Sequence, residues 1–176
     1  ALLQEELDTP MGKKTPTFSN LDEVSASTLG LFQMAAKMMK RMDREAFGHF
    51  ILSMTQSVSD ILGVYVLAKM AGLFKEEDGE VYCTLPIVPL FETIDDLQRA
   101  PEMMQEILSI PIIVQSIKHQ TGVQEVMIGY SDSAKDAGVM SAGWAQYHAM
   151  ESLVKVAEEE GVELTLFHGR GGTIGR

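Results

Sequence analysis

Cysteine and basic residues are scarce in this chain, which has one cysteine and 14 Lys and Arg against 25 Asp and Glu in 176 residues. Cys83 alone cannot form an intrachain disulfide or a zinc knuckle, and such low cysteine usage is typical of the reducing cytosol. The formal net charge of −11 argues against a nucleic-acid binder that works through bulk positive charge. We therefore expect a cytoplasmic protein without a nucleic-acid partner.

Long apolar runs are also missing. The longest candidate, residues 61–74, is interrupted by Lys69, whereas a membrane-spanning helix needs about 20 apolar residues. Residues 1–8 lack the basic stretch and apolar run of a secretory signal. We expect no membrane partner and no signal peptide at this N-terminus. The hydrophobic content of 45% is nevertheless enough for one domain with a sizeable core.

Short apolar runs alternate with segments of helical periodicity after residue 46. The predicted strands are 47–54, 84–91, 125–130 and 164–167. The predicted helices cover 25–45, 61–71, a segment that begins after Thr93, 101–108, 110–118 and about 134–160. Residues 1–24 are rich in Thr, Pro, Lys, Ser and Asp and are expected to form an extended lead-in.

Strands that alternate with helices indicate an α/β fold with a parallel sheet and right-handed crossovers. Two architectures remain open on the pattern alone, an open doubly wound sheet and a (β/α) barrel, of which four strands would be half. Local signals support the helix limits: Ser57 and Asp60 resemble a capping box, and Thr93 is a good N-cap. Pro101 is predicted to start a helix, and Gly161 to end one.

Polar residues follow each predicted strand. The carboxyl ends of parallel strands meet at one edge of the sheet, and ligands bind at that edge in both architectures. The residues that we expect to converge there are Ser53, Thr55, Glu92, Ser131, Asp132, Lys135, His168 and Arg170.

Several of these residues allow more than one interpretation. Glu92 and Asp132 could hold a hard cation such as Mg²⁺, or each could cap the helix that follows it. Lys135 could reach an anion at the same edge or lie solvated in a first helical turn. His168 could belong to a site, be buried with a hydrogen bond, or lie on a surface loop.

The segment 167–176 is rich in glycine and carries Arg170 and Arg176 after His168. Glycines let main-chain N–H groups approach an anion closely, and the arginine fork matches phosphate or carboxylate. The glycine spacing does not fit the dinucleotide fingerprint, and no Walker lysine follows. The sequence therefore predicts an anion-binding loop of another kind.

Three segments resemble signature motifs of phosphoenolpyruvate carboxylase, in the family's order and with near-family spacing. They are residues 89–97, 126–138 and 167–176, and residues 50–62 resemble the segment upstream of them. The resemblance covers about residues 25–176. It implies a partial (β/α) barrel over this range, about half of an eight-stranded barrel with extra helices.

The resemblance also implies an activity, a cofactor and roles for single residues. Family enzymes are cytosolic, allosteric homotetramers that join bicarbonate to phosphoenolpyruvate with Mg²⁺ or Mn²⁺, giving oxaloacetate and phosphate. Glu92 and Asp132 would hold the metal, and Arg170 would bind the substrate phosphate. His168 would hold the carboxyphosphate intermediate with Lys135 near the bicarbonate, while Arg176 would lie on a mobile loop, in reach of bicarbonate and of acidic inhibitors.

The chain also departs from the family pattern. It lacks the upstream Thr-Ala-His-Pro motif, the later strands of the barrel and the inhibitor-site residues. We therefore expect an internal piece of such an enzyme, inactive alone, whose partners are the remaining segments of the enzyme. The alternatives are a non-catalytic α/β assembly module that retains the motifs, and another Mg²⁺-dependent barrel enzyme acting on enolpyruvate or a keto acid.

Overall fold

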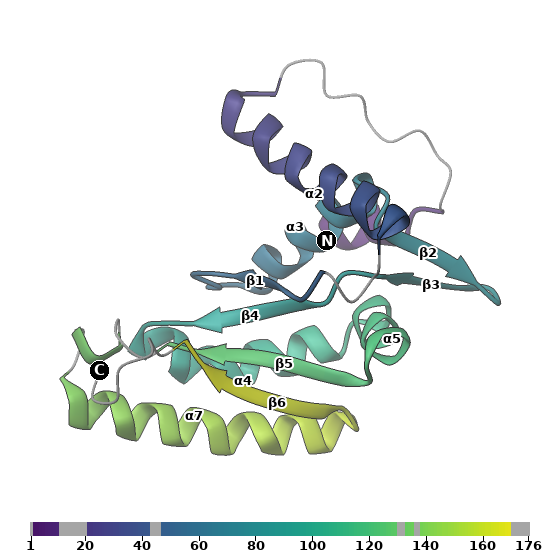
Figure 1. Cartoon of the computed structure of the whole chain (residues 1–176). Coiled ribbons are helices and arrows are strands. Elements are labelled where there is room, and N and C mark those ends of the chain that lie inside the picture. The colour runs from purple at the N-terminus through teal and green to yellow at the C-terminus, as the bar shows by residue number, and fades with distance from the viewer. Residues whose placement is uncertain (1, 11–20, 43–46, 130–132, 136–137, 170–176) are drawn as a thin grey trace.

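Four parallel strands form the central sheet in the computed structural model, which describes residues 2–10, 21–42, 47–129, 133–135 and 138–169 (Figure 1). The strand order is β1-β4-β5-β6, and each neighbouring pair is parallel. The strands are β1 (Phe50–Leu52), β4 (Ile87–Phe91), β5 (Val123–Ile128) and β6 (Glu163–His168). The predicted α/β class and parallel sheet are therefore confirmed. Within the described residues β1 and β6 are the sheet edges, and no closed barrel is formed.

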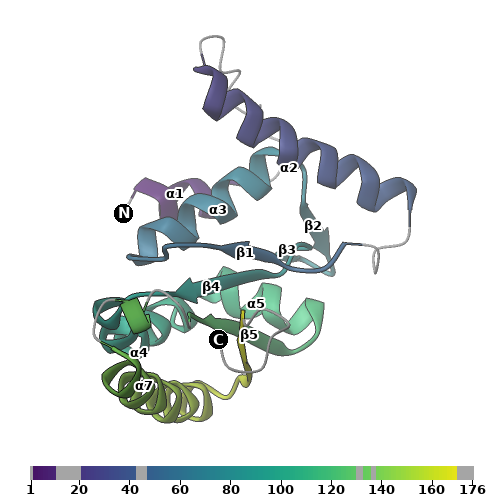
Figure 2. The ribbon, with the colours of Figure 1, turned by 60° about the vertical axis from the view of Figure 1, so that its left-hand side comes forward.

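Helices connect successive strands of this sheet. They are α3 (Val58–Met70), α4 (Ile94–Leu108), α5 (Pro111–Gln120) and α7 (Val139–Glu160). In Figure 2, α4 and α7 lie together on one side of β4 and β5, whereas α3 and the long α2 (Glu23–Arg41) lie beyond β1. Every residue of β4 is buried, as expected for a parallel strand that is covered on both faces.

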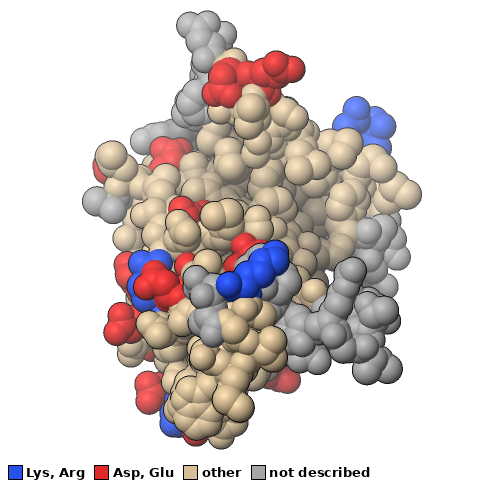
Figure 3. Space-filling model, turned by 90° about the vertical axis from the view of Figure 1, so that its left-hand side faces the viewer, with Lys and Arg blue, Asp and Glu red and all other residues tan. Residues whose placement is uncertain are grey.

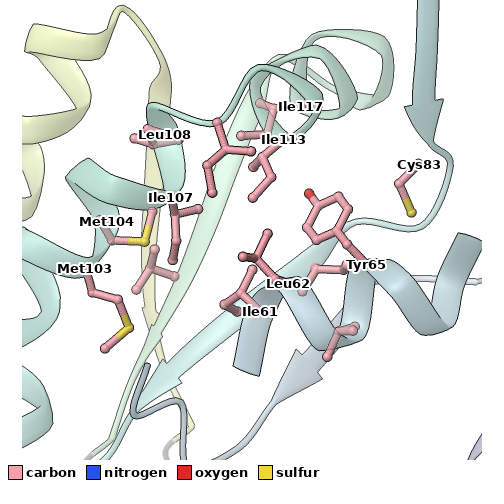
Figure 4. Close-up of a cluster of buried hydrophobic side chains, with 14 of the residues drawn as sticks. Ile61, Leu62, Tyr65, Cys83, Met103, Met104, Ile107, Leu108, Ile113 and Ile117 are labelled. Atoms are coloured by element: carbon pink, nitrogen blue, oxygen red, sulfur yellow. The ribbon is translucent and has the colours of Figure 1, made fainter. Parts of the chain in front are cut away.

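The core fills the space between the helices and the sheet. Figure 4 shows side chains of α3, α4 and α5 meeting there, among them Ile61, Tyr65, Met104 and Ile113. Methionine fills irregular gaps in such a core because its side chain is unbranched and flexible. The methionines of α4, Met103 and Met104, serve this role, as the helical spacing predicts.

Both predicted N-terminal caps are present. Asp60 Oδ2 accepts hydrogen bonds from the main-chain N–H of Ser57 at 2.8 Å and of Gln56 at 3.0 Å. Thr93 and Asp96 cap α4 reciprocally, with Asp96 N–H donating to Thr93 Oγ1 at 3.1 Å and Thr93 N–H to Asp96 Oδ2 at 3.0 Å. These bonds satisfy donors that a helix start leaves unpaired. They fix where α3 and α4 leave the strand ends.

Three features differ from the sequence-based expectation. Pro101 does not start a second helix but lies inside α4, because burial of one apolar face along all of 94–108 outweighs the hydrogen bond that proline removes. The acidic segment 76–80, expected to be only the turn that closes the helical unit 61–71, is the tip of a hairpin of β2 (Phe74–Glu77) and β3 (Glu80–Cys83). Its turn places Asp78 and Gly79 at positive φ, which is the signature of a two-residue hairpin loop.

The third difference lies in the expected lead-in 1–24, where Leu2–Asp8 form helix α1 and α2 starts at Glu23. Lys69 of α3 reaches the end of α1 and donates to the carbonyls of Glu6, Leu7 and Thr9 at 2.6–2.8 Å. These carbonyls lie at the helix C-terminus, where a cation is favourable. Tertiary docking therefore stabilises a helix that is too short to be stable alone.

The only cysteine is expected to be unreactive in the folded chain. Cys83 is fully buried, and this burial raises the pKa of its thiol to about 12. Because the thiolate is the nucleophile, Cys83 should stay protonated at neutral pH and react with a disulfide reagent only when the chain unfolds. Stopped-flow labelling at pH 8 with and without denaturant measures this. Labelling of the folded chain at the unfolded rate would contradict the burial of Cys83.

Candidate active site at the carboxyl ends of the strands

The strand register brings the predicted residues to one edge of the sheet. Phe91 pairs with Ile128, and Ile128 pairs with His168, so the last residues of β4, β5 and β6 form one row. Glu92, Gly129 and Gly169 follow this row directly. The arrowheads of β4 and β5 point to the left in Figure 1, and Figure 3 looks onto that side, where acidic and basic side chains lie near one another.

Glu92 is half-buried and is held in place by two neighbouring elements. Its Oε2 accepts a hydrogen bond from the main-chain N–H of Met54, which follows β1, at 3.1 Å. Its carbonyl accepts a hydrogen bond from the buried hydroxyl of Ser133. Helix α4 is capped by Thr93 and Asp96 rather than by Glu92, so the capping interpretation of Glu92 is wrong. Its carboxylate remains available for chemistry.

Gly129 lets β5 approach the end of β4 closely. Its N–H donates to the Phe91 carbonyl at 2.7 Å. A Cβ at position 129 would lie 2.7 Å from Glu92 Cα and 3.0 Å from the Phe91 carbonyl oxygen, closer than side-chain carbons are found to pack. Gln146 of α7 donates to the Gly129 carbonyl at 2.7 Å. Glycine is therefore required here for space, and it sets the distance between the two strand ends.

The loop after β1 is tied to β4 and α4. Thr55 is completely buried, and its Oγ1 donates to the Leu52 carbonyl at 2.8 Å and accepts from Leu90 N–H at 3.3 Å. Arg99 of α4 donates to the Gln56 carbonyl at 3.0 Å. Two polar residues are predicted to follow β1. Thr55 is buried and holds the loop in place, whereas Ser53 is exposed.

His168 is the last residue of β6, and its side chain lies on the same sheet face as Ile128 because the two residues are paired. Its Nδ1 is buried and accepts or donates no hydrogen bond among the described residues. Alternation places Gly169 on the other face, where a Cβ would overlap Met127 Cε. His168 and Glu92 therefore lie at the same edge of the sheet.

The remaining predicted residues are only partly described. Lys135 lies in a short helical stretch, 133–135, and is exposed. Ser131, Asp132, Arg170 and Arg176 fall outside the described residues. Within the described ranges, no group of three or more His, Cys, Asp or Glu gathers as a metal site. Glu92 is a hard oxygen donor at a strand end, and it suits a cation that takes one or two carboxylates.

Two contributors to this edge could not be found by sequence reasoning. The Met54 N–H is a main-chain donor, and Ser133, although it lies within the segment 126–138, carries no sequence signal of its contact with Glu92. A groove of about 1080 Å³ lies elsewhere, between α4 and α7, and is lined mainly by apolar and small residues such as Leu97, Met140 and Trp144. It includes none of the strand-end residues. Within the described ranges, every helix is too short or too polar to cross a membrane.

Comparison with known proteins decides the family. The family model described as phosphoenolpyruvate carboxylase matches residues 1–176. The chain belongs to the phosphoenolpyruvate carboxylase family. Among curated family members, the phosphoenolpyruvate carboxylase of Methylorubrum extorquens is 51% identical over 156 residues, which cover 89% of this chain and 17% of that protein.

Two further phosphoenolpyruvate carboxylases show the same relation. That of Vibrio parahaemolyticus is 56% identical over 140 residues, covering 80% of this chain and 15% of that protein. That of Rhodothermus marinus is 41% identical over 182 residues, covering 99% of this chain and 19% of that protein. The chain thus spans less than a fifth of the length of these relatives. Phosphoenolpyruvate carboxylases belong to the lyase class of enzymes.

Proposed function

We propose that this chain supplies the metal- and phosphate-binding half of the catalytic barrel in a cytoplasmic, homotetrameric phosphoenolpyruvate carboxylase. The whole enzyme would join bicarbonate to phosphoenolpyruvate and release oxaloacetate and phosphate. The family match over residues 1–176 carries this proposal. The parallel sheet supports it, because β1 and β6 leave two edges on which further barrel strands can pair.

The proposed metal ion is Mg²⁺ or Mn²⁺, held by Glu92 and Asp132. When bound, such an ion stabilises developing negative charge on the oxygens of its ligands. Glu92 fits this role because its carboxylate stands at a strand end and is not used to cap α4. Asp132 is proposed as the second ligand because it lies in the segment 126–138, which resembles a signature motif of the family.

The other proposed roles concern anions. Arg170 would bind the substrate phosphate through its planar fork, and Arg176 would contact bicarbonate on the glycine-rich loop. Lys135, exposed and next to the strand ends, would add positive charge near bicarbonate. His168 would hold the carboxyphosphate formed when the phosphoryl group moves to bicarbonate. Its buried Nδ1 has no partner among the described residues and can still take one.

A chimeric enzyme tests this function. The matching segment of the Methylorubrum extorquens relative, 51% identical to this chain, is replaced by residues 1–176. We expect the chimera to form oxaloacetate in a reaction that requires bicarbonate and Mg²⁺, measured by coupled reduction to malate. The isolated chain should form none, because it spans only 17% of that relative.

Two outcomes would contradict the proposal. A folded, tetrameric chimera without activity would show that these residues do not serve the carboxylase reaction, and would favour the non-catalytic module. Oxaloacetate formation by the isolated chain would show that the site does not need the rest of the enzyme. The host enzyme with the segment deleted is the negative control.

A further inference from the structure

The Glu92 carboxylate is oriented by a main-chain donor from the turn that follows β1. Met54 N–H lies 3.1 Å from Glu92 Oε2, although the two residues are 38 positions apart. Oε1 receives no hydrogen bond from the residues that the structure describes. One oxygen is therefore held by Met54, and the described residues leave the other open to a ligand.

Met54, which presents this N–H, has a left-handed backbone. Its φ is 52°, a conformation that non-glycine residues rarely adopt and that costs free energy. The Met54 side chain is 63% exposed, so packing of the side chain does not account for the conformation. The surrounding main chain must hold it.

Thr55, the residue after Met54, holds the turn that follows β1 in place. Its hydroxyl bridges the end of β1, at the Leu52 carbonyl, and the carboxyl end of β4, at Leu90 N–H. Its own N–H donates to the Leu90 carbonyl at 3.3 Å. Because Thr55 is completely buried, losing its hydroxyl would leave buried partners unsatisfied. These hydrogen bonds offset the free-energy cost of the left-handed backbone at Met54.

The main chain of Glu92 is fixed independently of this turn. Ser133 binds its carbonyl, and Gly129 packs against its Cα. The freedom that remains to Glu92 is rotation of its own side chain. The Met54 N–H removes much of that freedom.

We propose that Thr55 and the Met54 N–H form a positioning clamp that presents Glu92 Oε1 to the metal ion. The inference rests on the proposed function, in which Glu92 is a metal ligand. Thr55 acts through Met54 and Glu92 and touches neither metal nor substrate. Groups that orient a ligand in this way are worth about 10–100-fold in metal affinity.

Two matched pairs of variants test the clamp in the 176-residue chain and in the chimera. Thr55→Val removes the hydroxyl and keeps the side-chain shape, whereas Thr55→Ser keeps the hydroxyl. Met54→Val disfavours positive φ through its branched Cβ, whereas Met54→Gly accepts it. The readouts are Mn²⁺ affinity, from the spin resonance signal of free Mn²⁺, and hydrogen exchange of the residue 54 amide.

We expect Thr55→Val and Met54→Val to weaken Mn²⁺ binding about tenfold and to speed amide exchange at residue 54 about tenfold. Thr55→Ser and Met54→Gly should stay within about twofold of the parent affinity. Met54→Val keeps the test decisive if Thr55→Val fails to fold, because the residue 54 side chain is exposed.

The clamp and the metal assignment can fail separately. Unchanged Mn²⁺ affinity in Glu92→Ala would overturn Glu92 as a ligand in the proposed function. Loss of affinity in Glu92→Ala, with parent affinity in folded Thr55→Val and Met54→Val, would overturn the clamp alone.

Discussion

Replacing Glu92 by alanine is expected to weaken Mn²⁺ binding by about 100-fold, because it removes one of the two carboxylates that we propose as ligands of the ion. The same change should lower the melting temperature little. Among the described residues, the carboxylate accepts one hydrogen bond, from Met54 N–H, and the main-chain contacts of residue 92 with Ser133 and Gly129 do not need the side chain. Isothermal titration with Mn²⁺ and a thermal melt measure the two effects.

Glu106→Ala is the matched control for that change. Glu106 is exposed on α4, so its loss changes the net charge equally without touching the strand ends. A drop in Mn²⁺ affinity of the same size in both variants would show that bulk negative charge, rather than the Glu92 ligand, attracts the ion.

Replacing Gly129 by alanine is expected to have the largest effect on stability. The new Cβ would stand 2.7 Å from Glu92 Cα and 3.2 Å from the Glu92 carbonyl oxygen, and main-chain atoms cannot turn aside as a flexible side chain can. Forcing β4 and β5 apart should cost about 1–3 kcal/mol and lower the melting temperature by about 2–4 °C for each kcal/mol. Mn²⁺ affinity should fall as well, because Glu92 moves with the strand end.

Gly143→Ala provides the control for the glycine change. Gly143 lies in α7, and a Cβ there would meet nothing within 4 Å. Alanine should therefore stabilise this helix by up to about 1 kcal/mol. A melting temperature for Gly129→Ala equal to that of the parent would show that the two strand ends are not packed as tightly as described.

The sequence predicts the framework of this site well. Alternating apolar runs and helical periods indicate the parallel sheet, and parallel strands bring their carboxyl ends to one edge whatever the loop details. Thr93 and Asp60 predict where helices begin, because capping depends on neighbours in sequence. Local patterns thus place Glu92 and His168 at one edge of the sheet.

The contacts that orient the site could not be predicted in the same way. The Met54–Glu92 hydrogen bond depends on a left-handed φ and on a pairing 38 residues apart, and neither leaves a local signal. Pro101 lies inside α4 because tertiary burial outweighs its local preference, whereas the strands of the hairpin 74–83 extend beyond the local turn signal of Asp78 and Gly79. The strand register that aligns Phe91, Ile128 and His168 is likewise not specified by an apolar run alone.

The position of a bound Mn²⁺ ion tests the central claim most directly. Anomalous scattering from crystals of the chimera grown with Mn²⁺ locates the ion without reference to activity. We predict one strong peak at the carboxyl ends of β4 and β5, within bonding distance of Glu92 Oε1 and of an Asp132 carboxylate oxygen. A fully occupied Mn²⁺ site elsewhere, with Glu92 bound only to Met54 N–H, would contradict the account.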